Sequence, residues 1–261
     1  FPTKPAPFDY QGVTREDLVD FTPRVRQMAV DAVDGYTLGP LFTPPTRPVD
    51  GGAQGTLMRP PDNGAAGWAG AAVDPVTGML YVPSRNNAVV IPLYTPDPAL
   101  GSSVPFTHGA PEADRLSGAR EGRRAGPQMP QGLPLVKPPY SRITAIDMNT
   151  GNHEWMVPLG DGDRYRNHPL LRDLNLPPLG DGVINGPLLT STLLITALTT
   201  GSSSDGPRLV AYDKKTGEIL GSVDLPAGAI GTPMTYMVDD KQYVALTVGG
   251  SPPKLIALKL P

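Results

Sequence analysis

Cysteine is absent from the 261-residue chain, which excludes disulfide bonds and metal sites built on thiolate ligands. Long apolar runs are also lacking, and no stretch of 18 apolar residues is present to form a membrane-spanning helix. A large charge of one sign is missing as well, because Lys and Arg total 22, Asp and Glu total 25, and the net charge is −3. The composition therefore gives no general electrostatic reason to bind nucleic acid.

The sequence begins Phe1-Pro2-Thr3, without an initiator methionine and without the pattern of a signal peptide. We therefore expect a fragment or a processed product, with any export signal encoded upstream.

Glycine and proline are abundant, with 30 and 33 residues respectively. The prolines lie mostly between apolar runs, which favours many short strands joined by long loops over general disorder. Residues 95–140 and 160–185 show no clear period. Loops of this length are usually lids, packing arms or disordered segments.

One short unit occurs twice. Residues 144–151 are Thr-Ala-Ile-Asp-Met-Asn-Thr-Gly and residues 210–217 are Val-Ala-Tyr-Asp-Lys-Lys-Thr-Gly; a weaker third copy lies at 72–78. The Asp side chain can accept hydrogen bonds from turn N–H groups, and the Gly supplies the positive φ of a tight hairpin. Such repeats predict the strand–turn–strand units of a propeller or a stacked β-architecture. Trp155 follows the first copy and is large enough to pack between neighbouring blades.

Most of the chain is predicted to be β-structure, with one helix near the beginning. Thr22 is the expected N-cap, Pro23 the first helical residue and Gly35 the residue that closes the helix; a further helix start is expected at Thr14. Runs typical of strands lie at 55–59, 69–73, 79–83, 88–93, 142–147, 153–157, 186–191, 193–198, 208–213, 218–223, 232–238, 242–248 and 254–259. These strands make about three blades. We expect residues 1–50 to form an extended arm and helical insertion, and residues 51–261 to form propeller blades.

Several phrases occur together in a fixed order. They are Trp68-Ala69-Gly70, Val73-Asp74-Pro75 with Gly78-Met79-Leu80-Tyr81-Val82, Pro138-Pro139-Tyr140, Gly186-Pro187-Leu188, and Thr232-Pro233-Met234 before Gly249-Gly250. Their order and spacing resemble the C-terminal half of the dehydrogenases that depend on pyrroloquinoline quinone (PQQ), and most of all the glucose and quinate dehydrogenase branch.

This resemblance implies an all-β fold, namely about half of an eight-bladed β-propeller with PQQ and a Ca²⁺-type cation near its axis. It implies oxidation of an alcohol, sugar or polyol by hydride transfer to PQQ, with electrons passed to cytochrome c or a membrane quinone, in the periplasm. In that family the catalytic Asp and most cation ligands lie in the N-terminal half of the propeller. That half is an expected partner, no catalytic or metal-binding residue is assigned here, and the fragment alone is expected to be inactive.

Four residues are candidates for contact with the cofactor. Trp68 offers a flat apolar face for a planar quinone, or else packs between blades. Asn185 could donate to a PQQ carboxylate, or else form an Asx turn before Gly186. Asp205 could pair with a cation or a basic residue near the cavity, or else belong to a solvated loop. Asn86 could supply the amide that the family often carries after the strand ending at Val82.

The chain also departs from the glucose-type pattern. Ser251-Pro252-Pro253 stands where glucose-type members carry a His soon after the last Gly-Gly, and Pro83-Ser84 stands where an amide residue is common. These changes argue against glucose as the substrate. They also leave open a second hypothesis, in which the chain is a non-catalytic β-propeller scaffold that binds a protein or a glycan.

Overall fold

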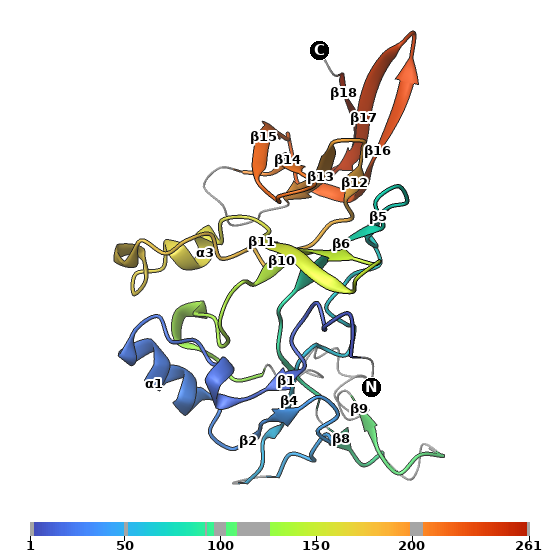
Figure 1. The fold of residues 1–261 in the computed structure, drawn as a ribbon. Helices are drawn as coiled ribbons and strands as arrows, with labels where there is room; N and C mark the ends of the chain where they lie inside the picture. The colour runs from blue at the N-terminus through green and yellow to red at the C-terminus, as the bar shows by residue number, and fades with distance from the viewer. Residues whose placement is uncertain are drawn as a thin grey trace. The chain divides into compact units, whose positions relative to one another are not determined.

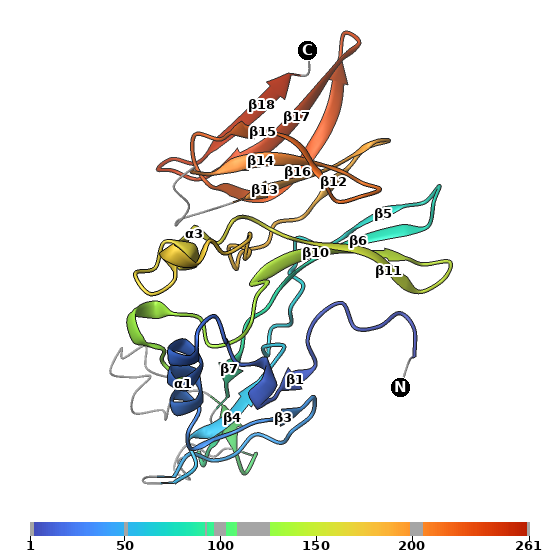
Figure 2. The same ribbon diagram turned by 60° about the vertical axis from the view of Figure 1, so that its left-hand side comes forward.

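Three antiparallel sheets are the main feature of the chain (Figures 1 and 2). The structure is a computed structural model, and it describes residues 3–49, 52–91, 93–96, 103–108, 126–198 and 206–259. The chain forms two compact units. The blade unit contains Phe1–Asp9, Ala65–Asn86 and Pro138–Pro261, and the helical unit contains Tyr10–Gly64 and Asn87–Lys137.

The three sheets all belong to the blade unit. The first has the order β11-β10-β6-β5 and contains β5 (Ala72–Asp74), β6 (Met79–Arg85), β10 (Ser141–Asp147) and β11 (Asn152–Pro158). The second has the order β12-β13-β14-β15 and contains β12 (Leu188–Leu189), β13 (Leu193–Leu198), β14 (Arg208–Asp213) and β15 (Ile219–Asp224). The third has the order β16-β17-β18 and contains β16 (Ala229–Val238), β17 (Lys241–Val248) and β18 (Lys254–Lys259). A short α3 (Asp163–Arg166) and the 3-10 helix η4 (Arg172–Leu174) follow the first sheet.

The repeated sequence unit forms the same turn in all three copies, as predicted. The Gly N–H donates to the Asp carbonyl at 2.8, 2.7 and 2.8 Å, in the pairs Gly78–Asp74, Gly151–Asp147 and Gly217–Asp213. The Asp carboxylate accepts the N–H two residues further on, from Val76, Asn149 and Lys215. Each glycine has a φ between 71° and 76°, a conformation that costs other residues strain.

Apolar side chains from facing sheets form the core of the blade unit. Between the first and second sheets, Tyr81 and Ile143 pack with Leu194, Val210 and Tyr212. Between the second and third sheets, a separate cluster joins β13 and β14 to the inner face of β17. Burying each such side chain contributes roughly 1.5–3 kcal/mol, so the sheets are held to one another as layers.

Trp155 packs between two sheets, as predicted. It lies on β11 with its ring centroid 5.7 Å from that of Tyr81. Its Nε1 donates to the Lys214 carbonyl at 3.3 Å, in the repeated turn of the second sheet. A Cβ on Gly217 would lie 2.8 Å from the indole ring, so a glycine is required there by contact as well as by backbone conformation. At the matching place in the second copy, Gly221 makes no such contact.

The helical unit contains the predicted helix, α1 (Pro23–Ala32). Thr22 is its N-cap and accepts the Val25 N–H at 3.1 Å, while Val33 is the C-cap and Gly35 follows with a φ of 80°. The helix start expected at Thr14 is a single 3-10 turn, η1 (Arg15–Asp17). The remaining elements are short: β1 (Gly12–Val13), β2 (Tyr36–Thr37), β3 (Gly39–Pro40), β4 (Gly55–Met58), β7 (Val89–Val90), β8 (Leu93–Tyr94), β9 (Thr107–His108) and η3 (Pro130–Gly132).

The structure divides the chain differently from the predicted boundary at residue 50. Residues 3–9 belong to the blade unit, where Asp9 forms an ion pair with Arg142 at 3.0 Å. Strand β4, predicted to belong to the blades, pairs with β2 and β7 in the helical unit. The difference arises because these pairings join segments far apart in the sequence.

Among the described residues, no helix has the length and apolar character needed to cross a membrane.

Candidate functional site

Three segments, one from each sheet of the blade unit, meet at the side of the sheets where β5, β12 and β16 begin. Thr232 Oγ1, on β16, donates to the Ala69 carbonyl at 3.2 Å, just before β5. Gly186, just before β12, lies against both Thr232 and Ala69 so closely that no Cβ would fit. A Cβ on Gly67 would meet the Ile184 side chain at 3.2 Å. We call this group the inner-strand cluster, and it consists of 65–70, 184–187 and 231–233.

Trp68 belongs to the inner-strand cluster, and its side chain is fully exposed. The contacts just described hold the backbone of its neighbours Gly67 and Ala69 in place, so the backbone that carries the exposed indole is held as well. The indole therefore does not fill the space between any two of the three described sheets. It leaves a flat apolar face available to another molecule or to another part of the protein.

Asn185 also lies in the inner-strand cluster, but its side chain is buried. Its Nδ2 donates to the Ala197 carbonyl at 2.8 Å, and its own carbonyl accepts a hydrogen bond from Thr196 Oγ1 at 3.4 Å. Both partners are on β13. The amide therefore holds the segment before β12 against the second sheet, which sets the position of Gly186.

The other two candidates have different outcomes. Asn86 is buried at the end of β6, and its N–H donates to the Tyr140 carbonyl at 3.0 Å. The neighbouring Arg85 N–H donates to the Ala65 carbonyl at 3.0 Å, so Asn86 adjoins the first residue of the inner-strand cluster. Asp205 lies outside the described residues.

The chemistry available in the inner-strand cluster is limited to binding and orientation. Trp68, Asn185 and Thr232 have side chains that do not ionise near neutral pH. Among the described residues, no group of three or more His, Asp or Glu side chains could hold a metal ion. The cluster can therefore form one wall of a site, but neither a general base nor a set of cation ligands is present in it.

Sequence analysis did not select Thr232 or Ala69, although both belong to phrases that carry the family resemblance. A signal was present. Each segment comes just before, or at the start of, the first strand of its sheet, as Trp68-Ala69-Gly70, Asn185-Gly186-Pro187 and Gly231-Thr232-Pro233 do. Comparing equivalent positions across the three sheets would have brought these residues together.

The family model and the individual proteins that the chain resembles point to the same family. Residues 1–244 match the family model described as "PQQ: Glucose/ethanol/alcohol dehydrogenase, beta-propeller domain". The chain is 29% identical over 229 residues to the quinoprotein glucose dehydrogenase of Escherichia coli, covering 80% of this chain and 26% of that protein. It is 36% identical over 122 residues to the quinate/shikimate dehydrogenase (quinone) of Acinetobacter baylyi, covering 46% of this chain and 14% of that protein.

Among solved structures, the quinohemoprotein alcohol dehydrogenase of Comamonas testosteroni matches with a TM-score of 0.43 and 23% identity, covering 74% of this chain and 23% of that one. The chain thus spans about a quarter of the length of relatives such as the E. coli protein. The all-β, partial-propeller fold predicted from the sequence is confirmed by the family match together with the three sheets.

Proposed function

Because the chain belongs to the family of PQQ-dependent glucose, ethanol and alcohol dehydrogenase β-propellers, we propose that it is the C-terminal part of an enzyme that oxidises an alcohol, sugar or polyol. The observation that carries this proposal is the inner-strand cluster, which presents the exposed indole of Trp68 where three sheets meet. A planar apolar face on a fixed backbone suits a planar, fused-ring cofactor.

The residues of the inner-strand cluster fit one side of a PQQ site. Trp68 would lie against the ring system, while Asn185 and Thr232 hold the backbone that carries it. When bound, PQQ supplies the acceptor for a hydride from the substrate carbon. The general base and the Ca²⁺ ligands would come from the rest of the protein, since the cluster offers neither.

The remaining partners are proposed from the family resemblance. Electrons would pass to cytochrome c or to a membrane quinone, and the protein would act in the periplasm. The missing blades of the propeller are the proposed structural partner. Support for that partner comes from the third sheet, because Ile230, Met234 and Leu255 are all more than half exposed.

The test uses the full-length protein reconstituted with PQQ and Ca²⁺. We expect dye reduction with at least one member of a panel of alcohols and sugars. Replacing Trp68 by Ala should weaken PQQ binding by at least about fivefold, measured by fluorescence quenching, because about 1 kcal/mol of aromatic contact is lost beyond the buried area. The matched control is Val76→Ala, which changes another highly exposed apolar side chain, in the Asp74–Gly78 turn.

The second candidate function is the non-catalytic scaffold, favoured by Ser251-Pro252-Pro253 in place of the expected His. It predicts no dye reduction with any alcohol or sugar and no quenching on addition of PQQ. That pair of results would overturn the dehydrogenase proposal. PQQ binding with equal affinity in wild type and Trp68→Ala would instead remove Trp68 from the cofactor site.

A further inference from the structure

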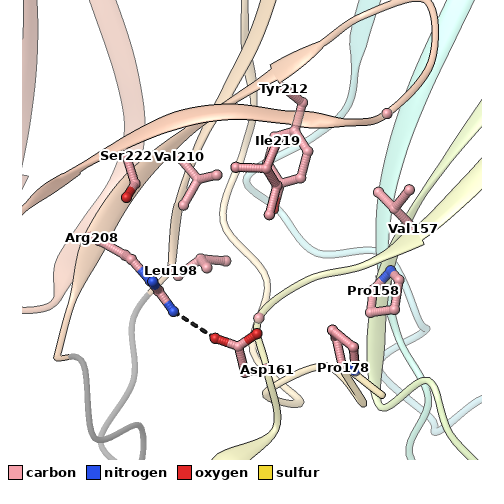
Figure 3. A pocket seen from close by; sticks show the side chains of 12 residues that line it. Val157, Pro158, Asp161, Pro178, Leu198, Arg208, Val210, Tyr212, Ile219 and Ser222 are labelled. Atoms are coloured by element: carbon pink, nitrogen blue, oxygen red, sulfur yellow. Dashed lines mark hydrogen bonds and ion pairs between the residues drawn. The ribbon is translucent and has the colours of Figure 1, made fainter.

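A cavity of about 240 Å³ lies between the first and second sheets of the blade unit (Figure 3). Its walls are mainly apolar, and come from Val157, Pro158, Pro178, Leu198, Val210 and Ile219. The strands that contribute are β11, β13, β14 and β15, together with the loop that follows β11. The inner-strand cluster, in contrast, lies where β5, β12 and β16 begin, so the cavity is a separate site.

An ion pair at one side of this cavity joins the second sheet to the loop that follows the first sheet. Arg208 Nη2, at the start of β14, lies 2.7 Å from Asp161 Oδ2, in the loop after β11. Figure 3 shows the two side chains meeting at one side of the cavity. The side chains are 20% and 33% exposed, respectively. Both charged groups are therefore accessible to a small molecule that occupies the cavity.

Two other polar side chains contribute to the wall. Ser222, on β15, is exposed and carries a hydroxyl. Tyr212 is buried, and its hydroxyl has no hydrogen-bond partner among the residues that the structure describes. Burial raises the pKa of the Tyr212 phenol, which favours the protonated form, in which the hydroxyl can donate a hydrogen bond.

The charge of the cavity wall selects among ligands. The Arg208 guanidinium and the Asp161 carboxylate neutralise each other. An anionic ligand would therefore be repelled by Asp161 and a cationic ligand by Arg208, and either would lose its hydration without gaining an unpaired counter-charge. A hydroxyl group avoids this conflict, since it donates to a carboxylate and accepts from a guanidinium at once. The apolar walls require a hydrocarbon face on the same molecule.

We propose that this cavity is a second binding site, for a compact, uncharged alcohol or diol with an apolar face. Its hydroxyl groups would hydrogen-bond to Arg208 and Asp161, and its hydrocarbon face would pack against Pro158, Pro178 and Ile219. The cavity is smaller than the roughly 300–1,000 Å³ of sites for drug-sized ligands, so the ligand is about the size of a single six-membered ring. The proposal does not depend on the PQQ site.

The test is a ligand titration on the full-length holoenzyme, without an electron acceptor, observed by saturation-transfer NMR. The probe is trans-1,2-cyclohexanediol, and cyclohexanecarboxylate and cyclohexylammonium are the charged controls. We expect the diol to bind, and both charged analogues to bind about tenfold more weakly or not at all.

The variant Ile219→Trp places a larger side chain in the cavity wall and should abolish diol binding there. Leu220→Trp is the matched control, because Leu220 is the next residue on β15, does not line the cavity, and is 59% exposed where Ile219 is 64% exposed. Both positions are at the surface, so neither variant should prevent folding. Equal binding of the three ligands, equal diol binding by the two variants, or no diol binding by wild type would each overturn the proposal.

Discussion

Asp74 shows how a single carboxylate joins two neighbouring sheets. It ends β5 of the first sheet, and its Oδ2 accepts a hydrogen bond from Lys214 Nζ in the repeated turn of the second sheet, at 2.7 Å. Its Oδ1 accepts the Val76 N–H of its own turn at 3.0 Å. The hydrogen bond from Lys214 is the main cause that lowers the pKa of Asp74 to about 2, with the Val76 N–H next in importance.

This pKa predicts a specific loss of stability in acid. The folded pKa of about 2 lies below the unfolded value of about 3.9. Asp74 therefore stabilises the fold above pH 4, and its contribution is lost as the pH falls from about 4 towards 2. We expect Asp74→Asn to lower the melting temperature at pH 7, and the difference from wild type to shrink below pH 4. Thermal unfolding at a series of pH values measures both.

A double-mutant cycle with Lys214→Met provides the control for this prediction. If Asp74 acts through Lys214, the two single variants lose stability and the double variant loses less than their sum. Fully additive losses, or a difference between Asp74→Asn and wild type that is constant down to pH 2, would contradict this account.

At the scale of the element, the repeated turn is both a local structure and a packing surface. Local features are in the sequence: the Asp carboxylate and the glycine with positive φ occur where they were predicted, and so do most of the strands. Contacts between sheets cannot be predicted from local sequence, because residues such as Lys214 and Asp74 are 140 positions apart. Some strand ends also differ. Strand β5 begins at Ala72 rather than 69, since Gly70 has a φ of 81°. Strand β16 begins at Ala229 rather than 232, and its pairing with β17 shifts register between Ile230 and Met234.

The packing role of the turn can be separated from its backbone conformation. Gly217→Ala places a methyl group 2.8 Å from the Trp155 ring at a φ of 76°, whereas Gly231→Ala has a φ of 91° with nothing within 4 Å. Both variants bear the cost of a left-handed backbone, roughly 1 kcal/mol. We expect Gly217→Ala to lose about 1–3 kcal/mol more, as overpacking does. Chemical denaturation measures the difference, and equal losses would show that Trp155 adjusts freely.

The N-cap of α1 gives a prediction for the helical unit. Thr22 accepts the Val25 N–H at 3.1 Å, so Thr22→Ala leaves a helix-terminal donor without its side-chain acceptor. The expected loss is about 1 kcal/mol of unfolding free energy. Thr22→Ser keeps the hydroxyl and should retain most of the stability. A loss in the Ser variant equal to that in the Ala variant would assign the effect to the Thr methyl group instead of the cap.

At the scale of the whole molecule, the third sheet carries an uncovered apolar face. Its inner face packs against the second sheet, but its outer face is apolar and exposed. Ile230 on β16 and Leu255 on β18 both pair with Thr247 of β17, and their side chains are 58% and 76% exposed. Among the described residues, β18 is an edge strand, and the third sheet has three strands where the other two sheets of the blade unit have four each. The sequence predicted the number of blades, but which face would be left uncovered became evident only from the strand register.

An apolar face beside an open strand edge favours pairing with another chain. We therefore expect the 261-residue chain, expressed alone, to dimerise or aggregate through the third sheet. The variant Ile230→Lys/Leu255→Lys places two charges on that face and should increase the monomer fraction. Val76→Lys, which adds a charge at a 91% exposed position in the first sheet's turn, should leave association unchanged. Light scattering measures the monomer fraction, and a monodisperse wild-type monomer that melts cooperatively would show that this part of the propeller needs no further blade to complete it.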